Sequence, residues 1–150
     1  MNKLPINFSS EALASGDFEQ AWLIQSGPVQ SLCSIPSEFG GSGGGFSPED
    51  LFLQAIMNCF LGTFKVYAKA SRVTFSNIKV KGQLTVDQDE SKKVSMKSVF
   101  LNIEFDGADR PERIETLVTK TMRDGFILNS VKSDIRYELV VNGHPAQKTL

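Results

Sequence analysis

The chain has 150 residues, of which 41% are hydrophobic and 22% are charged, and its formal net charge is -1. A chain of this length can bury a sizeable core and falls within the usual size of one domain, so we expect residues 1–150 to form a single domain. The near-neutral balance argues against nucleic acid or a membrane surface as a partner, because both require a concentrated basic face.

The charge is unevenly distributed along the sequence. No Lys or Arg occurs from Leu4 through Phe64, although this stretch carries six acidic residues. Any face that binds an anion must therefore use residues after Phe64.

Cysteine usage and the N-terminal sequence indicate the cytoplasm. Two cysteines are too few for a disulfide scaffold, and Met1–Pro5 lacks the apolar run of a signal peptide. The apolar run from Leu51 to Phe64 is shorter than the roughly 20 residues that a membrane span requires, so we expect a core helix there and no membrane partner.

The first predicted elements are two strands and a glycine-rich loop. Residues 21–24 and 29–35 are β-prone and flank the turn-forming Ser26-Gly27-Pro28, which predicts a hairpin. The loop over residues 40–45 precedes a helix, as phosphate-binding loops do, but it lacks a Gly-Lys-Ser/Thr ending and Glu49 and Asp50 would repel phosphate. We therefore expect a flexible connector or lid.

A long helix begins after this loop. Ser47 can cap the free amides, Pro48 suits the first helical position, and Glu49 and Asp50 complement the positive end of the helix. The apolar residues that follow cover every face instead of one stripe, which predicts a central helix that needs cover from more than one side. A partner chain could supply part of that cover.

The remainder alternates strands with a second helix. The segments around residues 78–86, 99–105 and 135–141 alternate apolar and polar residues, and the first two are joined by a charged turn. Arg110-Pro111-Glu112 starts an amphipathic helix that Gly125 ends or bends. Asn142-Gly143-His144-Pro145 is expected to end the ordered pattern, and the residues after it are expected to form a loose tail. The fold class is therefore α+β, a sandwich of mixed strands around a buried central helix.

The glycine-rich loop, Ser47-Pro48-Glu49, the apolar helix and Cys59 together resemble the OsmC/Ohr family of osmotically inducible and organic-hydroperoxide-resistance proteins. The resemblance implies a two-sheet, intertwined homodimer that reduces organic hydroperoxides. It also implies that Cys59 is the peroxide-attacking residue, with a resolving Cys in the second helix and an Arg-Glu pair beside Cys59 that includes Glu49.

The sequence departs from that family at two positions. Alignment on Asn129 places Gly125 where the resolving Cys would be, so the second helix has no thiol. The family's Arg comes from the N-terminal strands, and this chain has no cation there. An external thiol could replace the resolving Cys, whereas a missing cation leaves the thiolate of Cys59 unsupported.

Helix geometry limits how Glu49 and Cys59 can meet. Ten helical residues rise about 15 Å, so Glu49 cannot touch Cys59 of its own chain. Two central helices packed antiparallel about a two-fold axis near Gln54 would bring Glu49 of one protomer to Cys59 of the other. Lys65 and Lys69 of a partner helix could then act as substitute cations, although such lysines are more often solvated.

Other candidate residues have both a functional and a structural interpretation. The candidate walls of an apolar substrate pocket could equally be plain core packing; they are Phe52, Ile56, Phe60 and Phe126. Cys33 could be a substitute resolving thiol or a small buried hydrophobe. Cys59 itself could be inert packing.

No metal or cofactor is expected. The lone His144 and two separated cysteines cannot supply three or four zinc ligands, and no nucleophile-elbow sequence supports a hydrolase. The function we expect is reduction of a small organic hydroperoxide by Cys59 and an external thiol reductant. The alternative is a non-catalytic protein of the same fold that binds a small apolar or thiol ligand.

Overall fold

The computed structural model describes residues 3–146 and contains two α-helices and two β-sheets, so the predicted α+β class is confirmed. The chain divides into two compact units, Met1–Phe52 (unit 1) and Leu53–Leu150 (unit 2), which we describe separately. A single domain over residues 1–150 stays a prediction. Residues 147–150, the end of the expected loose tail, lie outside the described residues.

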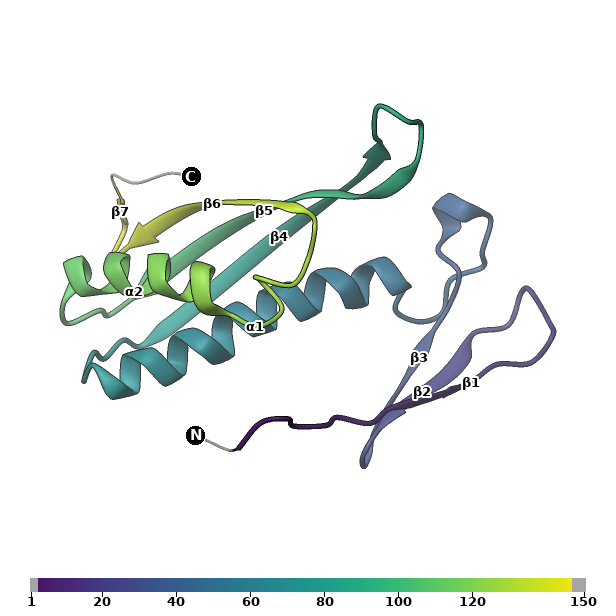
Figure 1. Cartoon of the computed structure of the whole chain (residues 1–150), viewed down its shortest axis with the longest axis horizontal. Helices are drawn as coiled ribbons and strands as arrows, with labels where there is room; N and C mark the ends of the chain where they lie inside the picture. The colour runs from purple at the N-terminus through teal and green to yellow at the C-terminus, as the bar shows by residue number, and fades with distance from the viewer. Residues whose placement is uncertain (1–2, 147–150) are drawn as a thin grey trace. The chain divides into compact units, whose positions relative to one another are not determined.

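Unit 1 contains a three-stranded antiparallel sheet (Figure 1). Its strands, in spatial order, are β1 (Glu11–Leu13), β2 (Trp22–Ser26) and β3 (Val29–Cys33). The predicted hairpin is present, with Ser26 opposite Val29 across the turn. Strand β1 was not predicted, because three residues are too few to show an alternating pattern. A short 3-10 helix, η1 (Ser37–Phe39), follows the sheet.

The glycine-rich loop is held against β3. The amide of Phe46 donates to the carbonyl of Leu32 at 2.9 Å, and the amide of Ser34 donates to the carbonyl of Phe46 at 2.9 Å. A Cβ atom on Gly45 would lie only 2.5 Å from the carbonyl oxygen of Leu32. Glycine is therefore needed at position 45 for close approach of the two backbones. The flexible connector or lid over residues 40–45 stays a prediction.

Helix α1 (Pro48–Ala70) begins where the sequence predicts and runs six residues beyond Phe64. The Ser47 hydroxyl accepts the Asp50 amide at 2.9 Å, and the Asp50 carboxylate accepts the Ser47 amide at 3.0 Å. This reciprocal pair is a capping box, which satisfies two backbone donors at the helix start.

Unit 2 is built on a four-stranded sheet of order β4-β5-β6-β7. Its strands are β4 (Asn77–Gln88), β5 (Val94–Asp106), β6 (Asp134–Val141) and β7 (His144–Pro145). Strands β4 and β5 form the predicted antiparallel hairpin, whereas β5 and β6 pair in parallel through the α2 crossover. The prediction that residues 142–145 end the ordered pattern is wrong. The chain turns at Asn142-Gly143, and β7 pairs with β6.

Both helices cover the same face of this sheet. Phe64 of α1 packs against Phe105 of β5 with ring centroids 4.6 Å apart. A Cβ on Gly82 would lie 2.8 Å from the Met57 sulfur and 2.9 Å from Leu53, so this glycine lets α1 approach β4 closely. Helix α2 (Pro111–Asp124) buries its apolar stripe, which is Ile114, Leu117, Val118 and Thr121.

Burial along α1 follows one stripe within the single chain. The buried residues are Ile56, Phe60, Phe64 and Ala68, at four-residue spacing, while the other apolar positions are half-buried or exposed. By length and composition alone α1 could also cross a membrane. Its stripe packs on a sheet, however, which is the arrangement of a core helix. The sequence predicts that every face of α1 is buried, but within one chain several of its apolar residues remain partly exposed.

Candidate functional site

Cys59 lies on α1 of unit 2 and is half-buried. A Cβ atom placed on Gly125 would be 3.2 Å from its sulfur, and the side chain of Leu128 lies on the same side of Gly125. The Thr63 hydroxyl, one helical turn farther along α1, is 4.0 Å from the sulfur. The thiol therefore lies between α1 and the segment that follows α2.

The approach of Gly125 to Cys59 does not result from an unusual backbone conformation. Its φ of -57° is open to any L-residue. What a side chain at position 125 would meet is Leu128, at 2.7 Å, and the Cys59 sulfur. The predicted place of Gly125 in the family pattern agrees with this geometry, because the position faces the thiol directly.

A polar network fastens the end of α2 to α1 beside this position. The Tyr67 hydroxyl donates to the Asp124 carboxylate at 3.1 Å, and Arg123 donates to the same carboxylate at 2.7 Å and 3.0 Å. The Arg123 hydrogen bond holds the pKa of Asp124 below its usual range. Desolvation, followed by the hydrogen bond to Asp124, raises the pKa of Tyr67.

Glu49 lies in the first turn of α1, ten residues before Cys59. Both residues are helical, so they are separated by about 15 Å along the axis, as expected from the sequence. The Glu49 Oε2 atom is buried and has no hydrogen-bond partner among residues 3–146. A buried carboxylate oxygen without a donor is costly, which makes this atom an acceptor that a further donor would stabilise.

Cys33 is a buried residue of β3 in unit 1. Burial raises the pKa of its thiol, and the negative charges of Glu49 and Asp50 raise it further. Both effects disfavour the thiolate that disulfide exchange requires. Its role as a substitute resolving thiol stays a prediction.

The four candidate pocket walls differ in exposure. Ile56 and Phe60 are fully buried in the core of unit 2, where Phe60 stacks on Phe64 at 5.9 Å. Phe52 is half-buried, whereas Phe126, next to Gly125, is 80% exposed. Phe126 is thus the candidate that a ligand approaching Cys59 from solvent could contact directly, and the roles of all four stay predictions.

The charged candidates lie at the surface. Lys65 and Lys69 are exposed residues of α1, and neither forms an ion pair within the described chain. In residues 3–146 no group of three or more His, Cys, Asp and Glu side chains could hold a metal ion.

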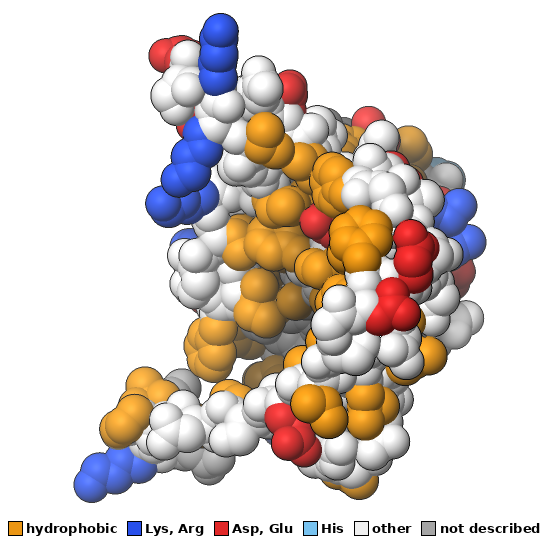
Figure 2. All heavy atoms as spheres, turned by 90° about the vertical axis from the view of Figure 1, so that its right-hand side faces the viewer, with side chains coloured by type: hydrophobic (Ala, Val, Ile, Leu, Met, Phe, Trp, Pro, Cys, Tyr) orange, Lys and Arg blue, Asp and Glu red, His pale blue; other side chains and the backbone are white. Residues whose placement is uncertain are grey.

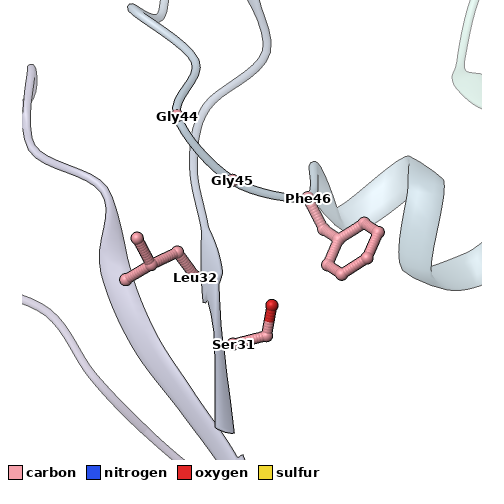
Figure 3. A pocket seen from close by; sticks show the side chains of 5 residues that line it. All are labelled: Ser31, Leu32, Gly44, Gly45 and Phe46. Atoms are coloured by element: carbon pink, nitrogen blue, oxygen red, sulfur yellow. The ribbon is translucent and has the colours of Figure 1, made fainter.

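A surface hollow of about 540 Å³ lies in unit 1 between β3 and the glycine-rich loop. Figure 3 shows the Ser31 and Phe46 side chains on one side of β3 and Leu32 on the other. The lining residues are Ser31, Leu32, Gly44, Gly45 and Phe46. None of these five side chains is ionisable.

Sequence reasoning overlooked two neighbours of Cys59. Thr63 follows it by four residues, a spacing that places both side chains on one face of a helix, so this neighbour could have been found. Leu128 belongs to the segment after α2 and has no such local signal.

Comparison with known proteins gives a consistent assignment. The family model described as OsmC-like protein matches residues 41–140. An organic hydroperoxide resistance protein from Xanthomonas axonopodis pv. citri is 27% identical over 139 residues, which is 89% of this chain and 94% of the relative.

Solved structures show the same fold. An OsmC-like protein of unknown function from Vibrio cholerae superposes with a TM-score of 0.80 at 17% identity, over 90% of this chain and 99% of its own. An organic hydroperoxide resistance protein from Legionella pneumophila superposes with a TM-score of 0.70 at 20% identity, over 93% of this chain and 98% of its own.

Proposed function

Because the chain belongs to the family of OsmC-like proteins, we propose that it reduces small organic hydroperoxides with the thiol of Cys59 and that an external thiol restores the enzyme. The name of the Xanthomonas relative, an organic hydroperoxide resistance protein, supports a role related to hydroperoxide resistance. No cofactor enters this chemistry.

The reaction has three steps. The Cys59 thiolate attacks the outer oxygen of the hydroperoxide, an S–O bond forms as the O–O bond breaks, and the departing alkoxide takes a proton from water to leave as an alcohol. The sulfenic acid then condenses with an external thiol to give a mixed disulfide and water. A second external thiol releases Cys59 and leaves as the oxidised disulfide of the reductant.

The observation that carries this proposal is the geometry at Gly125. Across a disulfide, the Cβ of one cysteine and the sulfur of the other are about 3 Å apart, given an S–S bond of about 2.04 Å. The Cβ position of residue 125 lies 3.2 Å from the Cys59 sulfur. This distance supports the view that residue 125 stands where a second cysteine could reach Cys59.

We further propose a homodimer in which Glu49 of one protomer approaches Cys59 of the other. The Oε2 atom of Glu49, which has no hydrogen-bond partner among residues 3–146, and the exposed apolar residues of α1 both support a second chain. In this arrangement Lys65 or Lys69 of the partner could supply the cation that residues 4–64 lack. The cytoplasmic location and the absence of nucleic-acid and membrane partners stay predictions.

One observation favours a non-catalytic alternative. Cys59 has no second thiol at position 125, and Cys33 is buried with a raised pKa. A protein that binds a small apolar or thiol ligand beside Phe126 would not need a resolving cysteine. Reactivity of Cys59 toward hydroperoxide separates the two functions.

Mass spectrometry of the intact protein after treatment with cumene hydroperoxide tests the proposal. We expect the wild type to gain oxygen atoms on Cys59, because no neighbouring thiol captures the sulfenic acid. In Gly125→Cys the same treatment should instead remove two hydrogens and join residues 59 and 125 by a disulfide, since the Leu128 side chain can rotate away.

A matched control adds a thiol in open space. No atom lies within 4 Å of the Cβ position on Gly16, so Gly16→Cys should leave oxidation of Cys59 unchanged. An unmodified Cys59 in the wild type at millimolar peroxide would support the binding protein. A rapid disulfide between residues 33 and 59 would instead identify Cys33 as the resolving thiol.

A further inference from the structure

The hydroxyl of Thr63 lies within hydrogen-bonding range of the Cys59 sulfur, with 4.0 Å between Sγ and Oγ1. Both residues belong to α1 and are separated by one turn, so their side chains lie on the same face. A thiol and a hydroxyl can each donate to the other, but a thiolate can only accept. Once Cys59 is ionised, Thr63 is therefore the donor.

The other helical threonines direct their hydroxyls differently. Thr116, Thr119 and Thr121 each donate to the backbone carbonyl four residues earlier, at 2.7–3.2 Å. For Thr63 that acceptor would be the carbonyl of Cys59. Within the part of the chain that the structure describes, the hydroxyl of Thr63 instead has the Cys59 sulfur as its hydrogen-bond partner.

The contact of the Thr63 hydroxyl with the Cys59 sulfur matters because the N-terminal part of the chain has no cation to stabilise a thiolate. Residues 4–64 contain no Lys or Arg, and Cys59 lies about three turns from the positive end of α1, beyond the reach of the helix dipole. A hydrogen bond from a neutral hydroxyl favours the charged form of the sulfur without any partner charge.

We propose that Thr63 is a catalytic residue of this site, which donates a hydrogen bond to the Cys59 thiolate and so supports the attack on the peroxide. The role rests on the proposed function for its peroxide step, but the interaction with the thiolate does not depend on it. As the S–O bond forms, the negative charge moves from sulfur to the departing alkoxide, and the hydroxyl of Thr63 keeps its own proton throughout.

The experiment compares three variants by the pH dependence of Cys59 alkylation with iodoacetamide. Thr63→Val keeps the shape of the side chain and removes the donor, Thr63→Ser keeps the donor, and Thr119→Val removes an exposed hydroxyl that bonds to a backbone carbonyl. Loss of a hydrogen bond to a charged group changes an equilibrium by about tenfold. We therefore expect Thr63→Val to alkylate about tenfold more slowly at pH 7 and to reach half its maximal rate at a higher pH.

Rescue by Thr63→Ser and no change in Thr119→Val complete the expected result. Equal pH profiles for Thr63→Val and wild type would overturn the proposal, and far-UV circular dichroism establishes that each variant is folded. If Thr63→Val fails to fold, the Thr63→Ala variant gives the same comparison without a branched side chain. The two proposals can fail separately. If alkylation of Cys59 depends on Thr63 but the wild type does not react with cumene hydroperoxide, the peroxidase function is wrong and the hydrogen bond from Thr63 is still supported.

Discussion

The two units of the chain differ sharply in how many of their apolar side chains are buried. Among residues 3–146, sixteen of the seventeen buried hydrophobic residues belong to unit 2, and Cys33 is the one that belongs to unit 1. Ten of the fourteen exposed large hydrophobic side chains belong to unit 1. Figure 2 shows apolar side chains at the surface, coloured orange.

The difference bears on the homodimer that we propose. Burial of apolar surface is the main favourable term in folding. Unit 1, Met1–Phe52, has almost none of it, because Cys33 is its one buried hydrophobic residue among the described residues. Unit 2 has a core of its own around Phe64 and Phe105. We infer that unit 1 is stable when its exposed apolar side chains are covered by a second copy of the chain.

The largest effect is expected for Ile56→Asp in the core of unit 2. Ile56 is 0% exposed, and a buried carboxylate without a partner costs several kcal/mol, which is comparable to the whole stability of a domain. The variant should lose the helical circular dichroism signal, most of which comes from unit 2. A folded variant with normal helix content would show that the core of unit 2 tolerates a charge and would erase the contrast between the units.

A substitution in unit 1 should dissociate the protein without unfolding unit 2. Leu32 of β3 is 46% exposed in the single chain, so Leu32→Asp costs little there. If a second copy covers it, the buried charge should weaken dimerisation by about a hundredfold or more. Sedimentation velocity at micromolar concentration measures the dissociation, and fluorescence of Trp22, the one tryptophan of the chain, reports on unit 1.

The matched control for this variant is Val94→Asp, which changes an exposed apolar residue of unit 2. We expect this control to sediment like the wild type. A stable, folded wild-type monomer at micromolar concentration would contradict the inference that unit 1 needs a partner.

Local rules predicted most elements, and longer-range geometry explains what they missed. The predicted cap Ser47, the alternation in β5 and the glycine after α2 all act over a few residues, and each element is present. The capping contact of the Asp50 carboxylate was not predicted. The parallel pairing of β5 with β6 depends on the crossover through α2, which no local pattern encodes. The ordered pattern was predicted to end at Asn142-Gly143, but this dipeptide also forms tight hairpin turns and does so here.

The candidate site was predictable in part. The resemblance marked Cys59, Glu49 and Gly125, and the structure brings Gly125 to the sulfur of Cys59. The contact of Tyr67 with Asp124 spans 57 residues and follows from the packing of the two helices, so the sequence alone could not indicate it. The composition of α1 predicts burial on all of its faces. Within one chain, however, only a single stripe of its residues is buried.

A moderate effect of pH is expected in unit 2. The amide of Thr74 donates to Asp109 and holds its pKa below the usual range, and Arg123 does the same for Asp124. A carboxyl whose pKa is lowered by folding stabilises the protein above its unfolded value of about 3.9, and this contribution is lost as the pH falls from there through the folded value. Stability should therefore decline below about pH 4.

Urea unfolding at pH 6 and pH 3 measures this dependence. Asp109→Asn should be less stable than wild type at pH 6. The difference should shrink at pH 3, because below the unfolded pKa of about 3.9 the wild type loses part of the stability that its lowered Asp109 pKa provides. A difference that is the same at both pH values would mean that Asp109 acts through its shape and not through its charge.

The smallest effect is expected for Tyr67→Phe, which removes the hydroxyl that links α1 to the end of α2. In the wild type Arg123 Nε also donates to Asp124 Oδ1 at 2.7 Å, and the substitution does not remove this hydrogen bond. The Tm should therefore fall by about 2 °C or less. The segment after α2, however, would lose the hydrogen bond that fixes Gly125 beside Cys59. We therefore expect alkylation of Cys59 to accelerate about two- to threefold, because a loosened turn exposes the sulfur more often. Since Cys33 lies in unit 1, its alkylation should not change, and equal acceleration of both cysteines would show that the variant loosens the whole molecule instead of this one turn.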